Sequence, residues 1–189
     1  VIIDGKDWRQ LTETTDASWL IANSSCGSGR CSGSIGDVSV DGWTWASTDD
    51  LRGLFDALIK PGTAQFPTVA DYSAAMDPDI ANAIGSVFAP TALFKLGNFT
   101  YREVRGLTRS LSGGATTLAY LMDNPFPNGP DIAGFDAAYP TNLGSPGTGL
   151  WLYRPAGVDV PEPATLALFG LGLAGLGFMR WRAVARRTQ

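Results

Sequence analysis

A run of uncharged residues near the end of the chain constrains the fold more than any other feature of the sequence. Ala164 to Met179 contains no charged side chain, and as a helix it would be about 24 Å long, against ~30 Å for the hydrocarbon core of a bilayer. Extending the helix to Ala185 gives about 33 Å, provided that Arg180 and Arg182 direct their charges toward the head groups. We therefore predict a single C-terminal hydrophobic helix within residues 164–189, just long enough to span a membrane.

Four arginines accompany the end of this run, namely Arg180, Arg182, Arg186 and Arg187. Positive side chains beside a membrane helix remain on the cytoplasmic side. We expect these arginines to form a cytoplasmic anchor and the residues before the helix to lie outside the cytoplasm. A helix in a protein core would instead have to bury four charges, which is rare.

Small residues share one face of the predicted helix. They are three or four positions apart, at Ala167, Gly170, Ala174 and Gly177. A face of this kind lets two membrane helices approach closely, so a homo-oligomer formed through the C-terminal helix is one expectation. The alternative, that glycine is simply tolerated in a short membrane helix, stays open.

The residues before the helix divide into a domain and a linker. Residues 154–163 contain three prolines, which lack an N–H donor and fix φ, so we predict a Pro-rich linker there. Residues 1–153 are long and apolar enough for one packed domain. Residues 1–160 carry 10 basic and 17 acidic side chains, a balance that repels phosphate backbones and disfavours a nucleic-acid partner.

Local patterns in the domain predict an α+β fold, an antiparallel sheet with a few short helices. Apolar residues at helical spacing from Leu51 to Ile59 predict a helix that Ser47 caps and Pro61-Gly62 ends. Two further helical stretches are predicted, one through Val69, Tyr72 and Met76 and one from Asp77 to Phe88.

Strand patterns occupy the rest of the domain. Val38 and Val40 lead through Asp41-Gly42 to Trp43 and Trp45, which predicts a hairpin around that dipeptide. A second hairpin is predicted from residues 100–108 and 116–122, with its turn at 112–114, and a last strand from residues 150–153. Residues 123–149 hold ten Pro or Gly residues and are predicted to form an exposed, functional loop.

The chain has two cysteines, Cys26 and Cys31, with a flexible Gly-Ser-Gly-Arg segment between them. This spacing allows the two sulfurs to meet, and a single pair suits an oxidising compartment, so we expect a disulfide. Two free thiols are the alternative. A zinc site is disfavoured because the chain has no histidine and no second cysteine pair.

The sequence favours a protein that is not an enzyme and holds no cofactor or metal. Histidine, the commonest general base, is absent. Asp49, Asp50 and Asp56 lie near one helix and could include a catalytic pair of carboxylates. Helix capping already accounts for Asp49 and Asp50. Oxygen ligands in the predicted loop could bind calcium: Asp123, Asn124, Asn128 and Asp131.

The domain also has five tryptophans, namely Trp8, Trp19, Trp43, Trp45 and Trp151. Any of these rings that is exposed could stack on a sugar, and any that is buried would fill the core.

The last thirty residues or so carry a recognisable signature. Val160-Pro161-Glu162-Pro163-Ala164, the Gly- and Leu-rich helix and the terminal arginines together resemble the PEP-CTERM sorting signal of Gram-negative bacteria. The resemblance implies export through an N-terminal leader and retention of the chain in the inner membrane by the helix. It also implies recognition of Pro161, Glu162 and Pro163 by an exosortase, followed by release to the cell surface or the extracellular matrix, with an exopolysaccharide as a further candidate partner.

The sequence is therefore consistent with three functions. The first is a non-enzymatic cell-surface or biofilm-matrix protein that is sorted through its C-terminal tag. The second is a structural subunit of an extracellular filament whose C-terminal helices pack in the core. The third is a carbohydrate-binding surface module that uses its tryptophans or residues 123–149.

Overall fold

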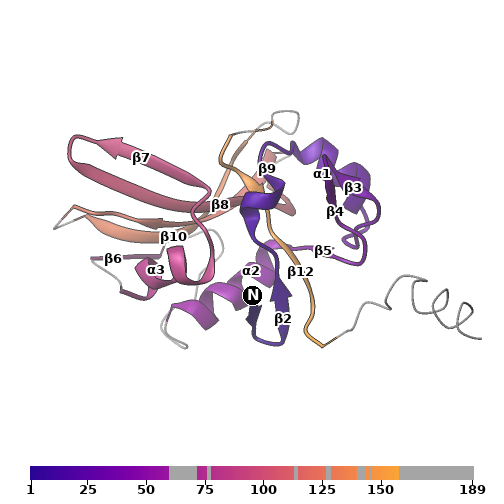
Figure 1. Ribbon diagram of the computed structural model, residues 1–189, viewed down its shortest axis with the longest axis horizontal. Coiled ribbons are helices and arrows are strands. Elements are labelled where there is room, and N and C mark those ends of the chain that lie inside the picture. The colour runs from indigo at the N-terminus through magenta and orange to yellow at the C-terminus, as the bar shows by residue number, and fades with distance from the viewer. Residues whose placement is uncertain are drawn as a thin grey trace, which may run out of the picture. The chain divides into compact units, whose positions relative to one another are not determined.

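The computed structural model describes residues 1–59, 72–75, 78–112, 115–126, 129–139, 144 and 146–157. Residues Val1–Ala156 form one compact unit of two main sheets with helices packed on them (Figure 1). The predicted linker beyond residue 157 and the C-terminal helix lie outside the described residues. None of the helices in the described part has the length and hydrophobicity that a membrane span needs.

The smaller sheet joins the beginning and the end of this unit. Its strand order is β1 (Ile2–Ile3), β2 (Lys6–Trp8), β12 (Leu152–Pro155) and β5 (Thr44–Trp45), and all neighbours are antiparallel. A tight turn links β1 to β2, since both Asp4 and Gly5 have positive φ angles, of 49° and 68°. Arg154 and Pro155, which we predicted as linker, belong to β12.

The larger sheet has the order β11 (Gly149–Leu150), β8 (Phe99–Ser112), β9 (Ala115–Asp123), β10 (Pro130–Tyr139) and β6 (Tyr72–Ala75). Strand β7 (Ala92–Leu96) pairs with the first half of β8, and only the β11–β8 contact is parallel. The predicted β8–β9 hairpin is confirmed. The fold is therefore α+β with mainly antiparallel sheets.

Both faces of the β8–β9 pair are covered, because side chains alternate along a strand. Val104 and Leu121 face one hydrophobic cluster, which also contains residues of α2 (Thr48–Leu58) and α3 (Pro78–Asn82). Leu107 and Leu118 face a second cluster, with Cys26 of α1 (Trp19–Cys26) and Trp45 of β5. The larger sheet thus lies between two cores.

Trp151 connects the two sheets. Its backbone N–H donates to Leu107 in β8, and its carbonyl accepts from Ala46, which follows β5. Its side chain is completely buried, with the indole N–H donating to the Ala119 carbonyl at 3.0 Å. The rings of Phe88 and Phe55 meet it edge to face, with centroids 5.3 and 5.9 Å away. Burial of the indole ring and its edge-to-face contacts with the two phenylalanine rings both stabilise the position of Trp151.

The helix predicted from residue 51 is α2, and its cap is as expected. The Ser47 hydroxyl accepts from the Asp50 N–H, and the Asp50 carboxylate accepts from the Ser47 N–H, so the pair forms a capping box. Leu51, Leu54 and Phe55 provide its buried face. Pro61-Gly62, the predicted stop signal, lies outside the described residues.

Four further local predictions are wrong, and two of them concern helices. Residues 72–75 form β6 rather than a helix, because pairing with β10 overrides their weak helical spacing. The helix predicted to reach Phe88 ends at Asn82, and the segment Ala83–Val87 after it is kinked, with non-helical backbone angles at Ile84 and at Gly85, whose φ is 110°. Val69, Met76 and Asp77 lie outside the described residues.

The other two corrections concern turns and loops. The hairpin before Trp43 turns at Gly36-Asp37, between β3 (Ser34–Ile35) and β4 (Val38–Ser39), and β5 pairs with β12 instead. Asp41-Gly42 does form a turn, closed by the Trp43 N–H and the Val40 carbonyl. Within the predicted 123–149 loop, residues 130–139 form β10, which pairs with β9 and β6 on its two sides.

Candidate functional site

The predicted sorting and membrane residues lie outside the described part of the chain. They comprise the sorting motif, the arginine anchor and the small-residue face: Pro161, Glu162, Pro163, Arg180, Arg182, Arg186, Arg187, Ala167, Gly170, Ala174 and Gly177. The geometry available for a functional site is that of the described residues up to 157.

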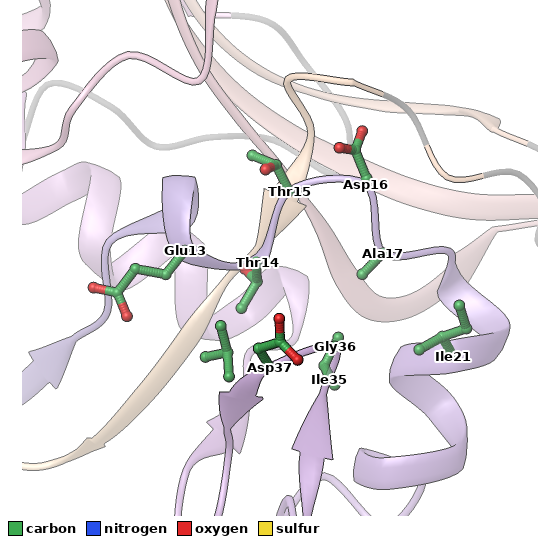
Figure 2. Close-up of a pocket in the computed structure, with 10 residues that line it drawn as sticks. Glu13, Thr14, Thr15, Asp16, Ala17, Ile21, Ile35, Gly36 and Asp37 are labelled. Atoms are coloured by element: carbon green, nitrogen blue, oxygen red, sulfur yellow. The ribbon is translucent and has the colours of Figure 1, made fainter.

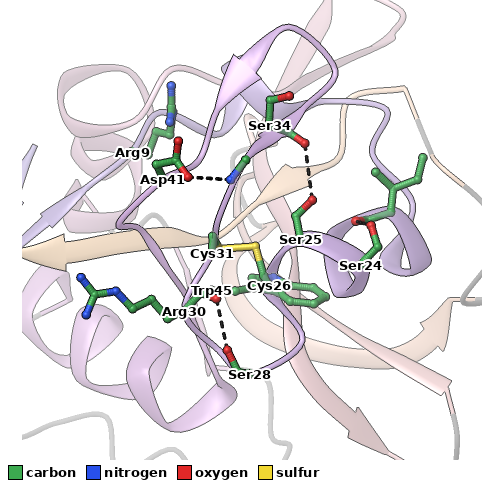
Figure 3. Close-up of a disulfide and its surroundings, with 12 residues drawn as sticks. Arg9, Ser24, Ser25, Cys26, Ser28, Arg30, Cys31, Ser34, Asp41 and Trp45 are labelled. Atoms are coloured by element: carbon green, nitrogen blue, oxygen red, sulfur yellow. Dashed lines mark hydrogen bonds between the residues drawn. A yellow bond between two sulfur atoms is a disulfide. The ribbon is translucent and has the colours of Figure 1, made fainter. Parts of the chain in front are cut away.

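The two cysteines are joined in a disulfide, as the sequence predicts (Figure 3). Cys26 ends α1, and both side chains are buried, with at most 3% of their surface exposed. The loop they close lies against β5, because the Cys31 N–H donates to the Trp43 carbonyl and the Trp45 N–H donates to the Gly29 carbonyl, each at 2.7 Å. The disulfide therefore fixes α1 to the smaller sheet.

Three of the five tryptophans in the described residues lie in the core. Trp8, Trp45 and Trp151 have no more than 1% of their surface exposed, so an external sugar cannot stack on them. Trp19 packs against Trp45, with centroids 5.7 Å apart. Trp43 is half-buried, and two guanidinium groups lie near its ring, Arg9 at 5.0 Å and Arg154 at 4.7 Å. The tryptophan version of the carbohydrate-binding hypothesis thus rests on Trp19 and Trp43 alone.

Two of the three carboxylates near α2, Asp49 and Asp50, serve structural contacts. Asp49 is exposed and pairs with Arg52 one turn later. Asp50 binds the helix cap through Oδ2, while its Oδ1 accepts from Lys6 Nζ and the Tyr153 hydroxyl, each at 3.0 Å. Burial opposes ionisation of Asp50, but the bonds from Ser47 and Lys6 outweigh it and lower its pKa. Burial and the adjacent Asp50 charge raise the pKa of Tyr153.

The residues considered for calcium have other partners where they are described. Asp123 pairs with Arg102, whose guanidinium also donates to the carbonyl of Ile84 at 3.2 Å. Asp131 is buried, and its Oδ1 accepts from the Asn124 N–H at 2.7 Å. Asn128 lies outside the described residues. Within the described ranges no three Asp, Glu, Cys or His side chains converge as metal ligands would.

An open groove of about 390 Å³ lies between η1 (the 3₁₀ turn Leu11–Thr14), α1 and the β3–β4 hairpin (Figure 2). Ala17, Ile21, Ile35 and Val38 give it an apolar floor. Three carboxylates line its rim. Glu13 and Asp16 come from the segment after β2, and Asp37 comes from the turn between β3 and β4. We call this surface the acidic groove.

Glu13 is the one rim carboxylate with an ion-pair partner among the described residues, since Arg9 Nε donates to it at 2.7 Å. Asp16 and Asp37 are exposed, and Asp16 has a φ of 69°, which is unusual for a residue other than glycine. Sequence patterns do not predict this groove. The residues that line it come from three elements. They come together only because the chain turns at Gly36-Asp37, whereas the sequence pattern predicts the turn at Asp41-Gly42.

The tip of the β7–β8 hairpin exposes large apolar side chains. They are Leu93, Phe94, Leu96 and Phe99, with 62%, 47%, 59% and 37% of their surfaces exposed. Leu96 and Phe99 face each other across the Gly97-Asn98 turn, and the Phe99 ring packs on Phe126 with centroids 4.5 Å apart. We call these residues, with Lys95, the hairpin tip. Phe94, Leu96 and Phe99 share one face of the hairpin, and Leu93 lies on the other. Exposed apolar side chains that group in this way mark interaction sites. The only sequence signal for it is the apolar run Leu93-Phe94-Lys95-Leu96-Gly97-Asn98-Phe99 around a Gly-Asn turn.

Comparison with known protein families identifies a sorting motif in the C-terminal region. A family model for the PEP-CTERM protein-sorting motif matches residues 159–183. No curated protein and no solved structure gives a significant match. The matched residues include Pro161-Glu162-Pro163, the hydrophobic run and two of the four arginines. The motif indicates export, a membrane-anchored intermediate and processing by an exosortase. This chain therefore carries a PEP-CTERM protein-sorting motif at residues 159–183.

Proposed function

We propose that this chain is a non-enzymatic protein of the cell surface or biofilm matrix, whose folded domain is delivered there through its C-terminal tag. The match at residues 159–183 is the observation that carries the proposal. The disulfide between Cys26 and Cys31 supports it, because such bonds persist in oxidising compartments outside the cytoplasm. The chain has no histidine, and Asp50 and Asp123 are engaged in ion pairs that hold the fold together.

The C-terminal tag contains three segments with different roles. Pro161-Glu162-Pro163 is the recognition element for the exosortase, the apolar run holds the chain in the inner membrane, and the arginines fix its cytoplasmic end. Processing next to the motif then frees the domain for the surface or matrix. In this scheme the tag is a substrate, and the domain provides the function at the destination.

The test is the intact mass of the surface form, compared between the full chain and a variant lacking residues 161–189. We expect the surface form of the full chain to end near Pro161-Glu162-Pro163, and the shortened variant to bypass the membrane intermediate. Glu162→Ala should cause the uncleaved form to accumulate in the membrane, whereas Glu13→Ala, a matched change within the domain, should be processed normally. A surface form that always keeps residues 164–189, together with unchanged localisation of the shortened variant, would refute the proposal.

A further inference from the structure

Charge is unevenly distributed over the domain. Residues 91–112, which form β7 and β8, carry four basic side chains and one acidic one, whereas the rest of residues 1–160 carries six basic and sixteen acidic side chains. Within this basic segment Arg102 pairs with Asp123, and Arg105 pairs with Glu103. Lys95 is exposed at the hairpin tip and has no ion-pair partner among the described residues. The tip therefore combines an available positive charge with exposed apolar side chains.

The acidic groove has the complementary composition. Its apolar floor includes Ile21, which is 50% exposed, and two rim carboxylates, Asp16 and Asp37, have no ion-pair partner within the described ranges. Leu93 of the hairpin tip could cover this floor while Lys95, two residues later on the same face of β7, meets the rim. Matching of opposite charges around an apolar contact selects partners and fixes their register.

The two surfaces cannot meet within one molecule. The hairpin tip lies at one end of the 1–156 unit, and α1 with the β3–β4 hairpin lies at the other (Figure 1). Each surface is thus available to another copy of the chain. A contact between two different patches is heterologous, and it generates a closed ring or an open filament according to the rotation between copies.

We propose that copies of this chain associate head to tail, the hairpin tip of one copy docking in the acidic groove of the next. Leu93 covers the groove floor of Ile21 and Val38, and Lys95, on the same face of β7 as Leu93, pairs with Asp37 or Asp16. This contact involves the folded domains, so it is separate from any packing of C-terminal helices. It goes beyond the delivery function proposed above and does not require processing of the tag.

Zero-length crosslinking of the full chain in detergent micelles tests the contact directly. A carbodiimide joins a lysine amine to a carboxylate that touches it, and the chain has three lysines, Lys6, Lys60 and Lys95. Equal amounts of light and heavy-isotope chains are mixed, crosslinked and mapped by mass spectrometry. We expect peptides that join Lys95 of one isotope to Asp16 or Asp37 of the other. Lys6 and Asp50, 3.0 Å apart within one chain, should give crosslinks between peptides of the same isotope.

Charge exchange provides the second test. Lys95→Glu should weaken self-association about tenfold or more in analytical ultracentrifugation, because like charges then face each other in the contact. Combining Lys95→Glu with Asp37→Lys should restore it. Arg30→Glu changes an exposed charge away from both surfaces and should have no effect.

Three results would overturn this proposal: full chains that remain monomeric at high concentration, association unaffected by Lys95→Glu, or mixed-isotope crosslinks that avoid residues 16 and 37. Association unaffected by Lys95→Glu would instead favour contacts through the C-terminal helices. An exopolysaccharide that protects the hairpin tip while the chain stays monomeric would assign the tip to a glycan. Membrane retention and processing of Lys95→Glu should match the wild type, so failure of this contact is distinguishable from failure of the delivery function.

Discussion

The Asp50 side chain makes several interactions that join different elements. Its carboxylate caps α2 through Ser47 and binds Lys6 of β2 and Tyr153 of β12. Lys6 also lies over the Tyr153 ring, 4.4 Å from its centroid. A single ionised side chain therefore joins one helix to two strands of the smaller sheet. Because the pKa of Asp50 is lowered in the folded protein, its ionised form stabilises the fold.

We predict that Asp50→Asn lowers the free energy of unfolding by about 1–3 kcal/mol at pH 7, since charged hydrogen bonds are lost. The stabilisation from a lowered pKa is present above the unfolded value, near 4, and disappears as the pH falls through the folded value. The difference between wild type and variant should therefore shrink at acid pH. Urea unfolding of both proteins at several pH values measures this difference in unfolding free energy. Asp49→Asn, at an exposed position, is the matched control, and an equal loss in both variants would contradict this role of Asp50.

At the scale of elements, close packing decides where glycine is required. Strand β11 lies against η1, where the Thr14 hydroxyl accepts from the Leu150 N–H at 2.9 Å. A Cβ at Gly149 would overlap the backbone carbonyl of Leu11, its carbon being 2.8 Å away. Because this obstacle is backbone, no side-chain rotation relieves it. Gly53 in the exposed part of α2 is the opposite case, because a Cβ added there would have no neighbouring atom within 4 Å.

We predict opposite effects of the same substitution at these two glycines. Gly149→Ala should destabilise the domain by about 1–3 kcal/mol, as overpacking does. Gly53→Ala should stabilise it by about 0.5–1 kcal/mol, because alanine favours the helix. Thermal unfolding followed by circular dichroism tests both variants. A Gly149→Ala protein as stable as the wild type would show that η1 does not pack against β11 in solution.

At the scale of the whole molecule, the domain is stabilised by two cores and one covalent link. Hydrophobic clusters cover both faces of the β8–β9 pair, and the disulfide holds α1 and the loop after it against β5. The sequence separation across the bond is five residues. A loop this short restricts the unfolded chain only modestly, so the link contributes about 2 kcal/mol in the chain-entropy model.

We predict that replacing both cysteines with alanine lowers the unfolding free energy by about 2 kcal/mol. Alanine removes the bond without placing a hydroxyl in the core, where both sulfurs are buried. Reducing agent should produce a similar decrease in the wild-type protein and none in the double variant. Equal stability of the oxidised and reduced wild type would mean that the bond adds nothing to the fold.

Strong local signals made part of this molecule predictable. Helix α2 combined an apolar face with a Ser47–Asp50 cap, and the β8–β9 hairpin combined two long alternating runs. The PEP-CTERM motif was recognisable because Pro161-Glu162-Pro163, an apolar run and arginines follow in a fixed order. Strands β6 and β10 were not predictable, because they exist through pairing with each other and with β9. The acidic groove was not predictable for a related reason, since tertiary contacts bring its lining residues together.

The position of β12 determines how the domain would bear tension applied through its C-terminal end. This strand lies between β2 and β5, and the Ala156 N–H just beyond it donates to the Gly5 carbonyl. Antiparallel hydrogen bonds run across the strand axis, so a pull along β12 loads its bonds to both neighbours together. Trp151, immediately before β12, anchors the other end of the strand in the core. A domain held by its tail thus receives mechanical force at a strand that is hydrogen-bonded along both of its edges.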